Sequence, residues 1–101
     1  MALVKVAELG EIPPGGRKRV LVKRHPIALF HLEDGFYAID DTCTHAEASL
    51  CEGQLMGDQV ACPLHGARFD IRTGKALTLP AVTPVTTYPV VVQGNDILVE
   101  V

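Results

Sequence analysis

Two short clusters of metal-ligating side chains stand out in this sequence. Each pairs one cysteine with one histidine: the first is Cys43-Thr44-His45, and the second is Cys62-Pro63-Leu64-His65. Sixteen residues separate them, so together they give the pattern C-x-H-x16-C-x-x-H. Thiolates and neutral imidazoles bind soft and borderline metal ions. Both segments have the composition of loops, so we expect two loop tips to converge on one metal centre.

Two kinds of metal centre use this ligand set. A structural zinc ion takes two cysteines and two histidines in a tetrahedron, but such sites usually begin with C-x2–4-C and end with H-x3–5-H. Here each cysteine is instead followed by a histidine. A zinc-stabilised interaction module stays open as an alternative, whereas the order of the ligands favours an iron–sulfur cluster with mixed ligands.

The cysteine count and the charge exclude several other functions. The 101-residue chain has three cysteines and a formal net charge of −3. An odd number of cysteines cannot form a complete disulfide framework, and scattered basic residues offer no patch for nucleic acid. The sequence has neither an export signal nor an apolar run of membrane length. We expect a cytoplasmic, soluble monomer that binds neither nucleic acid nor membrane.

Short β-type runs separated by turn residues must position the two clusters. The predicted strands cover residues 3–6, 18–22, 27–32, 36–39, 86–92 and 97–101, with a small hairpin at 54–56 and 59–61. Pro89 has no amide donor, so its strand should lie at an edge or be kinked there. We therefore predict an all-β fold in one domain, 1–101. Its antiparallel scaffold would comprise 1–40 and 76–101, and a cluster-binding subdomain of about 41–75 would be inserted between them.

The residues around the clusters resemble those of Rieske-type 2Fe-2S ferredoxins. CTHAEASL at 43–50 and CPLHGARFDIRTGKAL at 62–77 are close to the signature of the ferredoxin components of bacterial aromatic-ring-hydroxylating dioxygenase systems. The resemblance implies one 2Fe-2S cluster, with Cys43 and Cys62 on the inner iron and His45 and His65 on the outer iron. Two neutral imidazoles in place of two thiolates leave the cluster less negative, which makes it easier to reduce.

The same resemblance implies a one-electron carrier with no catalytic site of its own. Such ferredoxins receive electrons from a flavoprotein, NAD(P)H-dependent ferredoxin reductase and pass them to a terminal Rieske non-haem iron oxygenase. The sequence has no glycine-rich nucleotide-binding pattern, in agreement with a carrier role. The nearest alternative is the Rieske-like small subunit of a nitrite reductase or another oxidoreductase. That subunit can lack the four ligands that are present here.

Positions beside the ligands predict a low reduction potential. Compared with respiratory-chain Rieske proteins, Ala48 and Leu64 replace a disulfide pair, and Ala67 and Phe69 replace a Ser and a Tyr that hydrogen-bond to the cluster and its ligand. Fewer donors stabilise the reduced cluster less, so we expect a midpoint of roughly −150 mV, at the low end of the Rieske range.

The other reactive side chains are expected to have different roles. Cys51 should be a partly buried spectator, since it fits no cluster motif. His25, in an expected turn, and His31, in an expected strand, should be surface or hydrogen-bonded histidines. The proline-rich loop 79–84 is expected to shield the cluster. Some charged residues follow the clusters and form either solvated surface or a docking face: Glu47, Glu52, Arg68, Arg72 and Lys75.

Overall fold

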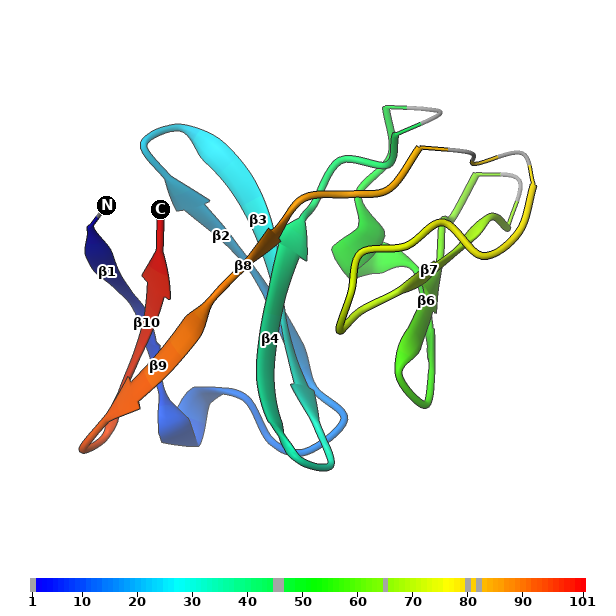
Figure 1. Ribbon diagram of the computed structural model, residues 1–101. Coiled ribbons are helices and arrows are strands. Elements are labelled where there is room, and N and C mark those ends of the chain that lie inside the picture. The colour runs from blue at the N-terminus through cyan, green and yellow to red at the C-terminus, as the bar shows by residue number, and fades with distance from the viewer. Residues whose placement is uncertain (1, 45–46, 65, 80, 82) are drawn as a thin grey trace.

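Three antiparallel sheets make up the computed structural model, which describes residues 2–44, 47–64, 66–79, 81 and 83–101 (Figure 1). The first half of the chain forms β1 (Leu3–Glu8), β2 (Arg17–Val22), β3 (His25–Leu32) and β4 (Gly35–Asp40). The second half forms β5 (Gln54–Met56), β6 (Gln59–Ala61), β7 (Arg68–Asp70), β8 (Thr87–Tyr88), β9 (Val90–Gln93) and β10 (Asp96–Glu100). Two short 3-10 turns, η1 (Leu9–Glu11) and η2 (Leu50–Glu52), complete the elements. The prediction of an all-β antiparallel fold is confirmed.

The strand orders are β1-β10-β9, β2-β3-β4-β8 and β5-β6-β7. The central strand β3 explains how the sheets are stacked. Side chains alternate across a strand, and both faces of β3 are buried: Ile27 and Leu29 pack into one core, whereas Phe30 and Leu32 pack into the other. A middle sheet covered on both faces accounts for the unbroken apolar run at 27–30. The sheet of β5, β6 and β7 lies on one side of the middle sheet, and the sheet of β1, β10 and β9 lies on the other side (Figure 1).

Pro89 divides the expected strand at 86–92 into two. Thr87 pairs with Ile39 in the middle sheet, whereas Val90 pairs with Val99 in the sheet of β9 and β10. The predicted kink is confirmed, but the prediction of a single strand is wrong. Proline lacks an amide hydrogen, so pairing is interrupted there and the chain passes from one sheet to the next. The Pro89 carbonyl still accepts a hydrogen bond from the Glu100 amide at 2.9 Å.

The turn between β2 and β3 lies before His25, which we expected in the turn itself. Lys23 and Arg24 both have positive φ, 51° and 68°, as a tight turn between antiparallel strands requires. His25 is therefore the first residue of β3 and not a turn residue. His31 lies in β3 as expected, and its Nδ1 is 2.8 Å from the carbonyl oxygen of Ile12. No helix in the described part of the chain is long and apolar enough to cross a membrane.

Candidate metal centre

The loops that follow Cys43 and Cys62 share one hydrogen-bonding design. In each, the cysteine amide donates to the carbonyl oxygen five residues later: Cys43 to Ala48 at 3.0 Å, and Cys62 to Ala67 at 2.7 Å. In the second loop the Gly66 amide also donates to the Cys62 carbonyl, at 3.2 Å. Gly66 has φ +70°, which a side chain would strain. The two loops are thus closed turns of equal length.

Both cysteine side chains are buried in the core beneath these loops. Cys43 is 4% exposed and Cys62 is 2% exposed, and they belong to the same cluster as Leu50, Val60 and Phe69. Burial raises the pKa of the Cys62 thiol, the Leu64 amide that hydrogen-bonds to it lowers that pKa, and the neighbouring Cys43 side chain raises it again. The two sulfurs therefore share one site. A metal centre that replaces their protons would stabilise both as thiolates.

The cysteine half of the expected ligand set fits an iron–sulfur cluster. Two sulfurs reach one place from two separate loops, and the surrounding side chains exclude water. His45 and His65 lie outside the described residues. Within the described residues, 2–44, 47–64, 66–79, 81 and 83–101, no group of three or more metal-ligating side chains comes together. The complete set of four ligands thus stays a prediction.

Cys51 is half-buried, as expected. Burial raises the pKa of its thiol, and the negative charge of Asp41 raises it further. A thiol whose pKa is raised carries little thiolate at neutral pH and is a poor nucleophile or metal ligand.

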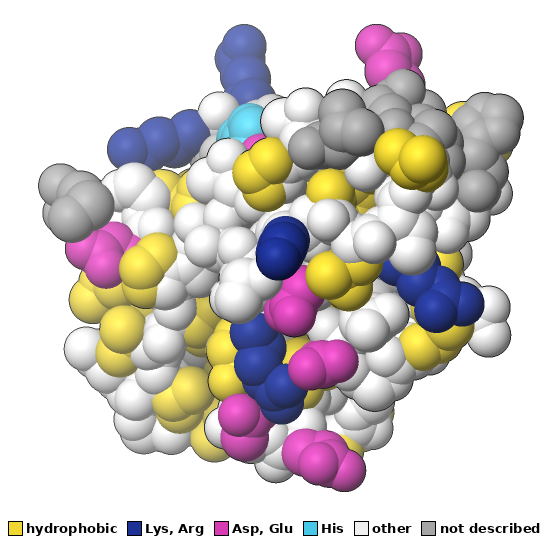
Figure 2. Space-filling model, turned by 45° about the vertical axis from the view of Figure 1, so that its right-hand side comes forward, with side chains coloured by type: hydrophobic (Ala, Val, Ile, Leu, Met, Phe, Trp, Pro, Cys, Tyr) yellow, Lys and Arg dark blue, Asp and Glu magenta, His cyan; other side chains and the backbone are white. Residues whose placement is uncertain are grey.

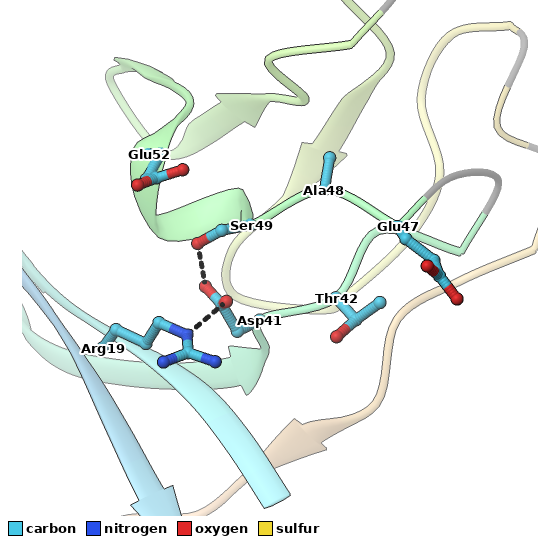
Figure 3. A pocket seen from close by; sticks show the side chains of 7 residues that line it. All are labelled: Arg19, Asp41, Thr42, Glu47, Ala48, Ser49 and Glu52. Atoms are coloured by element: carbon cyan, nitrogen blue, oxygen red, sulfur yellow. Dashed lines mark hydrogen bonds and ion pairs between the residues drawn. The ribbon is translucent and has the colours of Figure 1, made fainter.

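Asp41 is a residue of the site that sequence reasoning missed. It is 2% exposed, and its carboxylate accepts hydrogen bonds from Arg19 Nε at 3.0 Å, Ser49 Oγ at 2.9 Å and the Cys51 amide at 2.9 Å. Figure 3 shows the first two of these bonds, which join β2 and the end of the first ligand loop to the residue that follows β4. The only sign of Asp41 in the sequence is its place two residues before Cys43. Glu47 and Glu52 line the same groove, which has a volume of about 490 Å³.

A third segment reaches both ligand loops. The Thr44 hydroxyl donates to the Thr83 carbonyl at 2.7 Å, and the Arg68 amide donates to the Thr78 hydroxyl at 2.9 Å. Ala81 is buried in the same core as the cysteines. Pro80 and Val82, which belong to the expected shielding loop, lie outside the described residues, so shielding stays a prediction.

The surface near the ligand loops exposes large apolar side chains. Leu79 is 78% exposed, and Leu64 and Leu77 are also exposed. Figure 2 shows hydrophobic side chains near the top of one face and a group of acidic and basic side chains lower down. Arg72 is already engaged, since it pairs with Asp34 at 3.0 Å and Asp58 at 2.7 Å. It therefore joins the β3–β4 and β5–β6 turns through two ion pairs, whereas we expected its charge to be either solvated or part of a docking face.

Comparisons with known proteins agree with the geometry. A family model described as the Rieske [2Fe-2S] domain matches residues 2–89. The chain is 47% identical to the 3-phenylpropionate/cinnamic acid dioxygenase ferredoxin subunit of Photorhabdus laumondii, over 100% of this chain and 96% of that protein.

Two solved structures are also similar. The ferredoxin of carbazole 1,9a-dioxygenase from Nocardioides aromaticivorans IC177 has a TM-score of 0.92 and 40% identity, covering 98% of this chain and 97% of that one. A chain in the complex of reduced oxygenase and oxidized ferredoxin in carbazole 1,9a-dioxygenase has a TM-score of 0.90 and 39% identity, covering 96% of this chain and 91% of that one.

Proposed function

Because the chain belongs to the Rieske [2Fe-2S] domain family, we propose that it carries single electrons from a flavoprotein, NAD(P)H-dependent ferredoxin reductase to a terminal ring-hydroxylating oxygenase. The protein is a ferredoxin with one 2Fe-2S cluster and is not itself an enzyme. When bound, the cluster supplies one-electron redox chemistry. The proposed ligands are two thiolates and two imidazoles, from Cys43, Cys62, His45 and His65.

One observation carries the ligand assignment: Cys43 and Cys62 are buried side by side at the starts of two loops of the same design. Each cysteine amide hydrogen-bonds to the far end of its own loop, at Ala48 and Ala67, so both ends of each loop are held close to the sulfur. A scaffold of 1–40 and 76–101 and a cluster-binding subdomain of about 41–75 form part of the proposal. We also propose that the protein is a monomer.

The names of the relatives support the choice of electron acceptor. The Photorhabdus protein is named as a ferredoxin subunit of a dioxygenase, and the carbazole 1,9a-dioxygenase structure holds a ferredoxin together with its oxygenase. We propose an oxygenase of this kind as the acceptor and a flavoprotein reductase as the donor. The cytoplasmic location stays a prediction, to be checked by cell fractionation.

Spectroscopy of ligand variants tests the proposal. The purified protein, reduced with dithionite under argon, should give the rhombic electron paramagnetic resonance (EPR) signal of a mixed-ligand cluster, with an average g below that of all-cysteine clusters. Cys62→Ser and His65→Ala should lose this signal, whereas the control variants Cys51→Ala and His25→Gln should keep it. A colourless, EPR-silent protein with bound zinc would support the interaction module instead. Reduction by NADH plus the reductase, followed by oxidation by the oxygenase, tests the two partners.

A further inference from the structure

The Asp41 carboxylate uses both oxygens to join three parts of the chain. Oδ1 accepts from the Ser49 hydroxyl, and Oδ2 accepts from Arg19 Nε (Figure 3). Oδ1 also accepts from the Cys51 amide. The backbone of Asp41 adds two bonds, from its amide to the Pro26 carbonyl at 3.1 Å and from the Leu50 amide to its carbonyl at 2.6 Å. Asp41 therefore binds the end of the first ligand loop to the middle sheet.

The two ligand loops differ at their bases. The second loop leaves and re-enters a regular ladder, in which Ala61 pairs with Arg68 and Val60 pairs with Phe69. Among the described residues, the base of the first loop has a single isolated bridge, between Thr42 and Ser49. At the next position outward, the Leu50 amide donates to the Asp41 carbonyl, and the Asp41 side chain adds bonds from Ser49 and Cys51.

The chemistry of these bonds explains why a carboxylate is present. An ionised carboxylate only accepts hydrogen bonds, and all three of its partners here are donors. An asparagine would turn its NH2 group toward one of them. A buried carboxylate is costly unless it is paired with a positive charge. Arg19 on β2 provides that charge; its side chain is half-exposed and lines the groove.

We propose that Asp41, held by Arg19, is the positioning residue of the first ligand loop. It fixes Cys43 and the loop that carries the expected ligand His45 relative to Cys62, and thereby sets the geometry and the redox properties of the cluster. Groups that orient metal ligands from outside commonly change metal affinity about 10–100-fold when they are removed. The inference rests on the ligand assignment proposed above.

Three variants separate positioning from charge. Asp41→Ala removes the charge and all three side-chain bonds. Asp41→Asn removes the same charge, but its Oδ1 can still accept from Ser49 and Cys51 while its NH2 group faces Arg19. The control, Asp40→Asn, removes a charge one residue away, where the carboxylate bonds to His25 and Tyr88 and to neither ligand loop.

The measurements are made on the cluster-loaded protein under argon: the EPR linewidth, the midpoint potential and the rate of cluster release to an iron chelator. Asp41→Ala should release its cluster about 10–100-fold faster than the parent and broaden the EPR lines. Its reduction equilibrium constant should change at least tenfold, equal to about 59 mV for one electron. Asp41→Asn should fall between Asp41→Ala and the parent in linewidth and release rate, because its Oδ1 can still accept from Ser49 and Cys51 while the contact with Arg19 is lost. Asp40→Asn should match the parent in both.

Equal linewidths and release rates in Asp41→Ala and Asp41→Asn would overturn the proposal, because loss of charge would then explain the whole effect. Parental behaviour of Asp41→Ala would overturn it as well. If Asp41→Ala does not fold, Ser49→Ala removes a single loop donor and should give faster release in a folded protein; an unchanged rate there counts against positioning. A parent protein without the Rieske signal would instead reject the ligand assignment.

Discussion

Three glycines allow steric clash and backbone strain to be measured separately. A Cβ at Gly53 would lie 1.9 Å from the Ala61 carbonyl oxygen, in a backbone of ordinary negative φ, −76°. A Cβ at Gly94 would meet nothing within 4 Å, but φ there is +61°. Gly74 combines both conditions, with φ +79° and the Val85 carbonyl oxygen 2.2 Å from the Cβ position.

The expected costs follow from these surroundings. Gly94→Ala should lower the free energy of unfolding by about 1 kcal/mol, the cost of left-handed backbone for a residue with a side chain. Gly53→Ala should cost about 3 kcal/mol, the upper end of ordinary overpacking, because the opposing atom belongs to the backbone of β6. Gly74→Ala should cost the sum, about 4 kcal/mol, which is a large part of the roughly 5–15 kcal/mol that stabilises a domain.

Urea unfolding of the cluster-loaded variants under argon, followed by far-UV circular dichroism, gives the ranking. With an m-value of about 1–3 kcal/mol/M, each kcal/mol lowers the midpoint by roughly 0.3–1 M. Equal urea midpoints for Gly74→Ala and Gly94→Ala would refute this reasoning, because the Val85 carbonyl would then have moved aside at no cost. Gly53→Ala should also release the cluster faster, since Ala61 directly precedes Cys62, whereas Gly94→Ala should not.

Three further predictions concern the potential, pH and docking. The midpoint potential, measured by an EPR-monitored titration, should lie at roughly −150 mV, and a value above about +100 mV would contradict the argument from missing donors. Burial and the hydrogen bond to Asp40 raise the pKa of Tyr88 to about 12 from 10.0, so the folded state holds this proton longer than the unfolded chain and stability should fall as pH rises from 10 to 12. Chemical denaturation of Tyr88→Phe should show less of this fall, and an equal fall would assign it to other groups. Glu47→Lys should change the rate of electron transfer to the oxygenase and its salt dependence while the visible spectrum stays the same; unchanged kinetics would remove Glu47 from the docking face.

The sequence predicted those features that depend on local pattern. The strands β1, β2, β4 and β10 follow from β-type runs between turn residues, and the two cysteine clusters follow from residue type and spacing. Pro89 indicated a kink because its missing amide hydrogen is a local property. Its consequence, that the chain changes sheets there, depends on which strands pack beside it, and no local pattern contains that information.

The features that were missed depend on contacts between distant residues. Asp41 has the composition of an ordinary loop residue, and its role becomes visible only when Arg19 and Ser49 are brought to it by the fold. Strand β7 was missed because its residues, Arg68–Asp70, lie within the ligand signature and form only a short run. His25 was placed in a turn because it precedes a proline, whereas the positive φ of Lys23 and Arg24 puts the turn earlier.

The pairing of β1 with β10 places both ends of the chain at one end of the fold. Ala2 and Val101 exchange two backbone hydrogen bonds, each 2.9 Å long, and the loops of Cys43 and Cys62 lie at the opposite end (Figure 1). A linker attached at either end would begin far from the proposed cluster site. The domain can therefore be joined in tandem to another protein, or anchored to an electrode, with its electron-exchanging surface still turned outward.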